Sequence, residues 1–169
     1  MKLTFLSADR PLTKTITQKN GVIHKTDYHI PYNVTSEEVE ATTLKDVFQA
    51  ISTRASSKSK PCLFKGELIK PLVNESRAQM SERDTPTQLI MFDLDKAPFS
   101  TPAEFMNALG LPDMSYIWQW SSSSKLSKKD KTLNGHIFML LDAPVHPRLI
   151  KAWLMHLNLN TEVLRKHIT

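Results

Sequence analysis

The sequence predicts an α/β protein of the α+β kind, in which a mixed or antiparallel sheet carries packed helices. Segments with the two-residue alternation of strands and segments with the 3.6-residue period of helices follow one another loosely along the 169 residues. Hydrophobic residues make up 40% of the chain and charged residues 23%, the balance of a globular protein that can bury a core. No internal repeat interrupts this pattern. We therefore expect a sheet with helices on one face.

The first half of the chain contains one clear helix. Residues 11–33 hold few apolar side chains, which predicts an irregular arm or short edge strands. Residues 43–55 have the apolar stripe of an amphipathic helix, formed by Leu44, Val47, Phe48 and Ile51. Thr43, followed three positions later by Asp46, fits a capping box. A Ser- and Lys-rich segment, residues 56–61, then ends the helix.

The middle of the chain predicts a strand and a second helix. Residues 88–95 alternate, so that Leu89, Met91, Asp93 and Asp95 share one face while apolar residues share the other. A turn at residues 97–100 leads to a helix at 101–109. That helix has a cap, a first-turn proline, a capping-box acid and a terminal glycine, which are Thr101, Pro102, Glu104 and Gly110.

Two more strands and a helix follow. Residues 116–120 are rich in aromatic and β-branched side chains, and residues 135–141 are nearly all apolar, which predicts a strand buried on both faces. Between them lies a polar, lysine-rich hairpin loop at 121–134. A helix begins at Pro147, with an inner face of Leu149, Ile150, Trp153, Leu154 and Leu157. A short helical piece from Thr161 is expected after it.

Composition excludes several classes of protein. No apolar run approaches the roughly 18 residues of a membrane helix, and residues 1–10 lack the apolar stretch of a secretory signal. The single cysteine, Cys62, excludes an internal disulfide and an all-cysteine metal cluster, so we expect a reducing, cytoplasmic setting. The sequence contains no Walker-type phosphate loop, His-Glu-x-x-His helix or Gly-x-Ser-x-Gly elbow.

The charge balance favours an anionic partner. The chain has 22 Lys and Arg against 17 Asp and Glu, a net charge of +5, which mildly favours nucleic acid. The densest basic segment holds Lys125, Lys128, Lys129 and Lys131, opposed only by Asp130. A looser group comprises Arg54, Lys58, Lys60 and Lys65. The alternative interpretation is two solvated loops.

Residues 90–95, Ile-Met-Phe-Asp-Leu-Asp, are the most informative motif. Asp93 and Asp95 project from one face of a strand, about 7 Å apart at the backbone, so their side chains can converge on one or two divalent cations. Carboxylate oxygens suit Mg²⁺ or Mn²⁺, and the apolar opposite face gives the strand a rigid mount. The alternative is two acids that face water, which is costly at the end of a buried strand without a neutralising group.

A histidine opens the last strand. His136 follows Asn134 and Gly135 and leads the apolar run, so its backbone is expected to be well fixed. A neutral histidine can bind a metal and a protonated one can hold a phosphate, although a lone histidine at this place is more often structural. Asp142 lies about 20 Å further along the same strand, too far to share a nucleotide with His136, and residues 142–144 are expected to be the exit from the strand.

Two cations elsewhere could offset the charge of a polyphosphate. Lys65 follows a short apolar segment and precedes Gly66, and Arg77 follows Glu75 and Ser76. Either cation near a carboxylate pair would balance phosphate charge, with arginine adding a bidentate fork. Read alone, both are surface residues.

Together, these residues resemble the archaeo-eukaryotic primase superfamily, and most closely the primase-polymerases of phages, plasmids and integrated mobile islands. The resemblance rests on the hydrophobic-Asp-hydrophobic-Asp strand at 92–95 and on the later small-x-His strand start at 134–136. Supporting segments spread it over most of the chain: 3–7, 11–14, 63–68, 74–78, 121–123, 152–154 and 157–159.

The resemblance implies DNA-directed primer synthesis, a nucleotidyl transfer by two-metal-ion catalysis in replication of a mobile element. It implies that Asp93 and Asp95 hold Mg²⁺ or Mn²⁺ and that His136 contacts the phosphates of the incoming nucleotide. It further implies nucleotide-binding roles for Lys65, Arg77 and Ser122. The implied partners are a single-stranded DNA template, nucleoside triphosphates and a downstream helicase. The nucleic-acid backbone would be held by Lys125, Lys128, Lys129 and Lys131.

The family pattern has a third metal-binding carboxylate on a strand after the helix that contains Trp153, and the sequence ends before such a strand. We therefore expect residues 1–169 to be the amino-terminal part of a single primase-polymerase domain, with impaired catalysis. Two alternatives stay open. One is a non-catalytic nucleic-acid-binding module of replication. The other is a haloacid-dehalogenase-like phosphatase in which Asp93 attacks phosphate and Asp95 is acid and base, but Ala97 stands where that family prefers threonine or valine.

Overall fold

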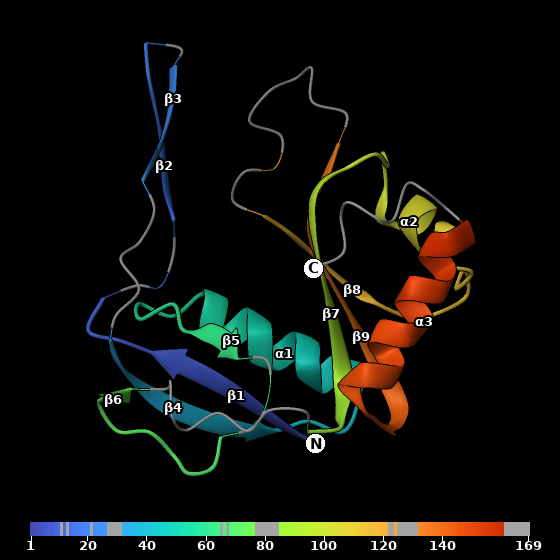
Figure 1. Cartoon of the computed structure of the whole chain (residues 1–169). Helices are drawn as coiled ribbons and strands as arrows, with labels where there is room; N and C mark the ends of the chain where they lie inside the picture. Colours follow the sequence, from blue (N-terminus) through green and yellow to red (C-terminus); the bar gives the residue numbers. More distant parts are fainter. Residues whose placement is uncertain are drawn as a thin grey trace. The chain divides into compact units, whose positions relative to one another are not determined.

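The structure is a computed structural model that describes residues 1–10, 12, 14–20, 22–26, 32–64, 66, 68–76, 85–121, 124 and 132–160. Contacts divide the chain into two compact units, Met1–Thr85 and Pro86–Thr169, here called the N-terminal and C-terminal units (Figure 1). Every strand pair in the described residues is antiparallel. The predicted α+β class, with packed helices and antiparallel pairing, is therefore confirmed. The expectation of one sheet is wrong, because the described strands form three separate sheets. The expectation of a single domain stays a prediction.

A four-stranded sheet forms the body of the N-terminal unit. Its order is β5–β1–β4–β6. The bounds are Lys2–Ser7 for β1, Asn33–Glu40 for β4, Cys62–Phe64 for β5 and Glu75–Ser76 for β6. Neither β1 nor β4 is among the strands that the sequence predicts. The reason is that β1 is short and that polar residues and three glutamates dominate β4, so neither shows a long apolar alternation.

Helix α1 (Leu44–Ala55) covers one face of this sheet. Its Arg54 guanidinium lies 4.3 Å from the centroid of the Phe5 ring and pairs with Glu37, the cross-strand neighbour of Phe5. The predicted capping box of Thr43 and Asp46 is confirmed, since each side chain accepts from the other's backbone N–H. Phe48, however, is 53% exposed, which corrects its predicted place in the buried stripe. The helix buries a narrower stripe than predicted, centred on Val47 and Ala50.

Strands β2 (Thr15–Lys19) and β3 (Val22–Thr26) form a separate two-stranded hairpin (Figure 1). Asn20, at the turn, has a φ of 50°, the left-handed conformation that asparagine adopts more readily than most residues. Of the two predicted descriptions for residues 11–33, an irregular arm or short edge strands, the described part shows short strands. They pair only with each other there.

The C-terminal unit contains a three-stranded sheet in the order β7–β9–β8, with β9 in the centre. The strands are β7 (Thr87–Ala97), β8 (Ile117–Trp120) and β9 (Leu133–Val145). The helices are α2 (Pro102–Ala108) and α3 (Pro147–Asn160). Buried side chains from one face of β7 and β9 pack with those of both helices in a single cluster. Both helices therefore cover the same face of this sheet, as predicted, and the opposite face carries Asp93 and His136.

Three details of the C-terminal unit differ from the prediction. Strand β9 continues to Val145, which pairs with Thr87, so the predicted exit at residues 142–144 is wrong. Leu149 is 64% exposed, because the stripe from Ile150 to Leu157 already completes the packed face of α3 and Leu149 lies outside it. Glu104 accepts from the backbone N–H of Ser100 rather than closing the box on the cap residue. The predicted helical piece from residue 161 lies outside the described residues.

Candidate functional site

The register of β7 and β9 brings two of the predicted site residues together. Asp93 and His136 are direct cross-strand partners. His136 Nε2 lies 3.3 Å from Asp93 Oδ1, and the two side chains are 30% and 52% exposed. The Asp-x-Asp strand and the small-x-His strand start are therefore neighbours in space, with their polar groups facing the same side.

Gln119 extends this pair into a row of three side chains across the sheet. It lies opposite His136 on β8, and its Oε1 is 3.3 Å from His136 Nδ1. The sequence analysis missed Gln119, because only the pairing register of β8 with β9 shows that it faces the histidine. We call Asp93, His136 and Gln119 the cross-strand row.

The protons on the two ring nitrogens of His136 depend on its neighbours in the cross-strand row, Asp93 and Gln119. An ionised carboxylate only accepts hydrogen bonds, so His136 must carry a proton on Nε2 to bond with Asp93. At Nδ1, a neutral ring accepts from the amide nitrogen of Gln119 and a protonated ring donates to its amide oxygen. By turning its amide, Gln119 can serve both states of the histidine.

A glycine allows β8 to approach β9 at this point. A Cβ atom on Gly135 would lie 2.4 Å from the backbone oxygen of Gln119 and 2.5 Å from the Trp118 ring. Any larger residue would push the two strands apart. Gly135 therefore keeps Gln119 in register with His136, which gives the Asn-Gly-His sequence a packing reason in addition to a functional one.

A β-bulge follows Asp93 on β7. Leu94 pairs with Gly135 and Ala97 with Leu133, so Asp95 and Lys96 together face the single residue Asn134. Leu94 and Ala97 are both buried, whereas Asp95 and Lys96 are both exposed. The bulge therefore leaves Asp95 on the side away from the core, as the alternation predicts, and adds Lys96 to that side.

Asn134 holds the bulge in place. This residue is only 4% exposed, and its Oδ1 accepts the backbone N–H of Lys96 at 2.7 Å. Lys96 has a φ of 54°, a left-handed conformation that costs free energy in any residue with a side chain. The sequence analysis missed Lys96. A signal was present, since buried residues three positions apart at 94 and 97 break the two-residue alternation.

The two carboxylates of the site fit a metal ion whose remaining ligands are substrate phosphates and waters. Among the described residues, no group of three or more His, Cys, Asp and Glu side chains is placed to hold a metal ion. Asp93 and Asp95 nonetheless supply hard oxygen ligands on an exposed surface. Mg²⁺ is commonly held by one or two carboxylates together with substrate phosphates and waters, and this donor set suits that arrangement.

The other predicted site residues lie outside the described residues: Lys65, Arg77, Ser122, Lys125, Lys128, Lys129 and Lys131. The ends of the lysine-rich segment are nevertheless described. The backbone N–H of Ser121 and the hydroxyl of Ser124 both donate to the backbone oxygen of Asn134. The segment that contains the four lysines therefore starts and ends beside the cross-strand row.

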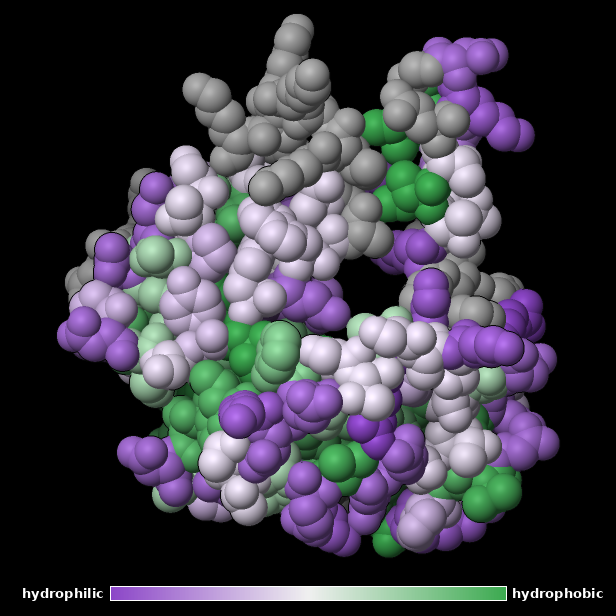
Figure 2. Space-filling view, turned by 180° about the vertical axis from the view of Figure 1, so that it is seen from behind, coloured by the Kyte–Doolittle hydropathy of each residue, from purple (hydrophilic) through white to green (hydrophobic). Residues whose placement is uncertain are grey.

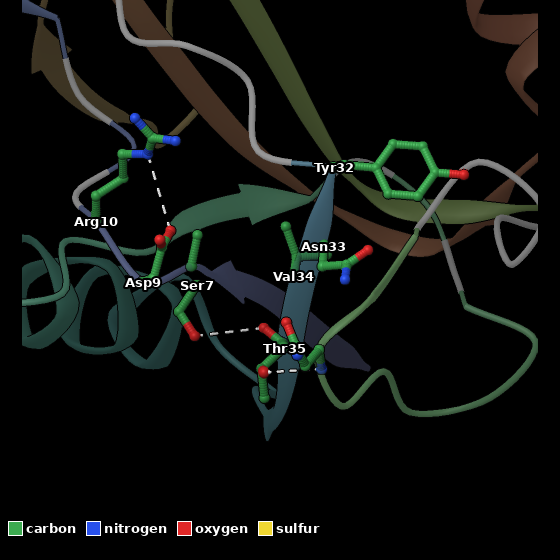
Figure 3. Close-up of a pocket in the computed structure, with 9 residues that line it drawn as sticks. Ser7, Asp9, Arg10, Tyr32, Asn33, Val34 and Thr35 are labelled. Carbon is green, nitrogen blue, oxygen red and sulfur yellow. Dashed lines mark hydrogen bonds and ion pairs between the residues drawn. The ribbon is translucent and has the colours of Figure 1, made fainter.

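The N-terminal unit has an open hollow of about 700 Å³ where β1 ends and β4 begins (Figure 3). None of the predicted site residues lines it. Its polar groups bond to one another: Ser7 donates to the Thr35 backbone oxygen, and Thr35 Oγ1 accepts from the Asn74 backbone at 3.2 Å. Arg10 lies 3.8 Å from the carboxylate of Asp9. These contacts involve part of the polar lining, which also includes Tyr32 and Asn33. Because none of the predicted site residues lines the hollow, the C-terminal unit remains the candidate site.

Comparisons of the chain with profiles of known protein families, with curated protein sequences and with solved structures found no match. Among the described helices, none is long and apolar enough to cross a membrane. The resemblance to the primase superfamily therefore stays a prediction.

Proposed function

We propose that this chain belongs to a primase-polymerase and contributes to DNA-directed primer synthesis, a metal-dependent nucleotidyl transfer. One observation carries the proposal. Asp93 and His136, from motifs far apart in the sequence, are opposed on neighbouring strands with their polar atoms 3.3 Å apart. Asp95 follows on the same exposed side. The proposed partners are single-stranded DNA, nucleoside triphosphates and a helicase, in the cytoplasm, during replication of a mobile element.

Each residue of the site has a role in this proposal. A bound Mg²⁺ or Mn²⁺ supplies activation of the attacking hydroxyl and charge neutralisation at the phosphates. Asp93 and Asp95 would hold it through carboxylate oxygens. His136 would turn its Nε2 proton from Asp93 to a phosphate oxygen, an acceptor of similar charge. Metal and nucleotide thus give both members of the Asp93–His136 pair new partners of opposite charge.

The sheet provides the rigidity that such a site needs. Ile137 and Met139, which follow His136 on the core side of β9, are almost fully buried. Phe92 and Leu94, on either side of Asp93, are buried as well. Functional groups held by packed strands keep their positions more precisely than groups on loops.

A second candidate function has its own supporting observation. The lack of a three-residue metal group among the described residues suits a replication module that binds nucleic acid without catalysing synthesis. The lysine-rich segment, whose described ends contact Asn134, would serve both candidates. The phosphatase alternative gains no comparable support, and a covalent phosphate on Asp93 would be its signature.

Primer synthesis on single-stranded DNA with labelled nucleotides and Mn²⁺ or Mg²⁺ tests the proposal. Asp93→Ala with Asp95→Ala should reduce product by about a hundredfold or more, as expected for groups that stabilise charge at the reacting atoms. The matched control replaces two other exposed aspartates of the same unit, Asp113 and Asp142, by alanine and should keep full synthesis. Product that is independent of Asp93 and Asp95 would contradict the proposal. DNA binding without any product would favour the binding module.

A further inference from the structure

The strands β2 and β3 form a two-stranded sheet of their own. Its two strands pair through five residue pairs, from Thr15 with Thr26 to Lys19 with Val22. In the part of the chain that the structure describes, no third strand joins them. A two-stranded hairpin alone is marginally stable in water, so a partner that covers it adds much to its order.

The charge on this hairpin has one sign. From Arg10 to Thr26 the sequence contains Lys14, Lys19 and Lys25 and no aspartate or glutamate. Lys19 and Lys25 are exposed, and neither forms an ion pair with a described acidic side chain. Hydrophilic side chains gather at the free end of the hairpin (Figure 2). Such a segment attracts an anionic partner.

The two exposed lysines lie on opposite faces of the hairpin. Cross-strand partners share a face, and successive residues of a strand alternate. Lys19 therefore shares a face with Thr17 and His24, whereas Lys25, the partner of Ile16, lies on the other face. Positive charge on both faces matches a partner that surrounds the hairpin better than a flat anionic surface such as a lipid bilayer.

We propose that the β2–β3 hairpin is an arm that enters a groove of duplex DNA, with Lys19 and Lys25 contacting phosphates on opposite walls. Paired strands lie about 4.8 Å apart, and the major groove, about 12 Å wide, admits a two-stranded ribbon. The exposed threonines and His24 add donors of the kind that bind phosphate and sugar without reading sequence. The choice of DNA rests on the proposed function, whose product is a primer–template duplex.

Anisotropy of a labelled 20-base-pair duplex, measured with the whole chain over a salt series, tests this arm. Lys19→Gln with Lys25→Gln should weaken duplex binding roughly tenfold at low salt and make the negative slope of log K against log salt shallower by about 2. The matched control, Lys45→Gln with Lys151→Gln, removes two exposed helical lysines and the same net charge. It should leave the slope nearly unchanged. Thermal unfolding checks that all variants are folded.

Three other results would contradict the proposal that the hairpin enters a groove of duplex DNA. Equal weakening by both lysine pairs would mean that only net charge matters. Equal loss on single-stranded DNA of the same length would exclude a groove. Loss of binding to phosphatidylserine vesicles with unchanged duplex binding would assign the hairpin to membranes.

The arm and the proposed function fail separately. If the chain makes no primers and Lys19→Gln with Lys25→Gln still weakens duplex binding more than the control pair does, the function fails and the arm stands. If primers are made but the hairpin lysines do not affect duplex binding, the arm fails and the function stands.

Discussion

The two units use their sheets in different ways. In the C-terminal unit, the central strand β9 is buried along most of its first half, and the chemistry-bearing side chains sit at fixed register positions on it and its neighbours. In the N-terminal unit, β4 and the described residues of the hairpin β2–β3 are largely exposed. Packing therefore holds the proposed site of the C-terminal unit in place, whereas the N-terminal unit exposes the proposed arm.

Removal of a core aromatic ring should have the largest effect. It should destabilise the C-terminal unit without destabilising the N-terminal unit. Phe105 is fully buried and contacts the edges of Phe92 and Phe99 at centroid distances of 5.6 and 5.5 Å. Phe105→Ala should cost about 3–5 kcal/mol of stability. Hydrogen exchange should then show lost protection in β7 and β9, with β1 still protected. Equal loss in both units would contradict their division.

Gly135, which lies against the Trp118 ring, should be the next most sensitive position. Gly135→Ala places a Cβ 2.4 Å from a backbone oxygen, so overpacking should cost about 1–3 kcal/mol. It should also disturb the cross-strand row. Gly110→Ala is the control: no atom lies within 4 Å of its Cβ, but its φ of 73° costs about 1 kcal/mol. Chemical denaturation measures both, and only Gly135→Ala should reduce primer synthesis beyond its loss of folded protein.

The sequence predicted the C-terminal unit far better than the N-terminal one. β7 shows apolar alternation, β9 contains a nearly continuous apolar run, and α2 has the Thr101 cap followed by Pro102. These local signals do not depend on a distant partner. β1 and β4 have no such local signal, because each forms a strand by pairing with the other, which the pattern of one segment alone does not show. The turn at Asn20–Gly21 carried the Asn-Gly signature of a tight hairpin, but few apolar residues flank it.

The sequence predicts which residues form the candidate site, whose role stays a prediction, but not their geometry. The types and spacing of Asp93, Asp95 and His136 pointed to a phosphate or metal site. Their distances depend on register, which is fixed by Gly135 and by the bulge that Asn134 holds, and neither can be read from a single strand's pattern.

Gln119 should have a smaller effect than either packing change. Gln119→Leu removes the partner of His136 Nδ1 and keeps the side chain's approximate size. As a positioning residue, Gln119 should affect the turnover number by about tenfold, the equivalent of 1.4 kcal/mol, with little change in KM. ¹⁵N shifts of the histidine ring should show an altered tautomer balance for His136. Gln49→Leu, on α1, is the control. Unchanged ring shifts with lost turnover would assign Gln119 a purely structural role.

The smallest expected effect is the pH dependence of the α1 cap in the N-terminal unit. Hydrogen bonds from the backbone and side chains of Thr42 and Thr43 lower the pKa of Asp46 from 3.8 to about 2. Because the pKa is lower in the folded state, the capping carboxylate stabilises the fold fully above about pH 4 and loses this contribution as the pH falls toward 2. Asp46→Asn should therefore lower Tm slightly at pH 5 and have a much smaller effect at pH 2.

Thr43→Ala provides the second half of this test. It removes the hydroxyl that accepts the Asp46 backbone N–H at 3.1 Å, at a cost of about 1 kcal/mol. That hydroxyl does not titrate, so part of its contribution should persist at pH 2, where most of that of the Asp46 carboxylate is lost. Thermal unfolding of both variants between pH 2 and 5 separates the two contributions. An Asp46→Asn effect that is as large at pH 2 as at pH 5 would mean that packing, rather than the carboxylate charge, holds the start of α1. The N-terminal unit would then resemble the C-terminal unit, in which packing fixes the structure, and the contrast between the two would weaken.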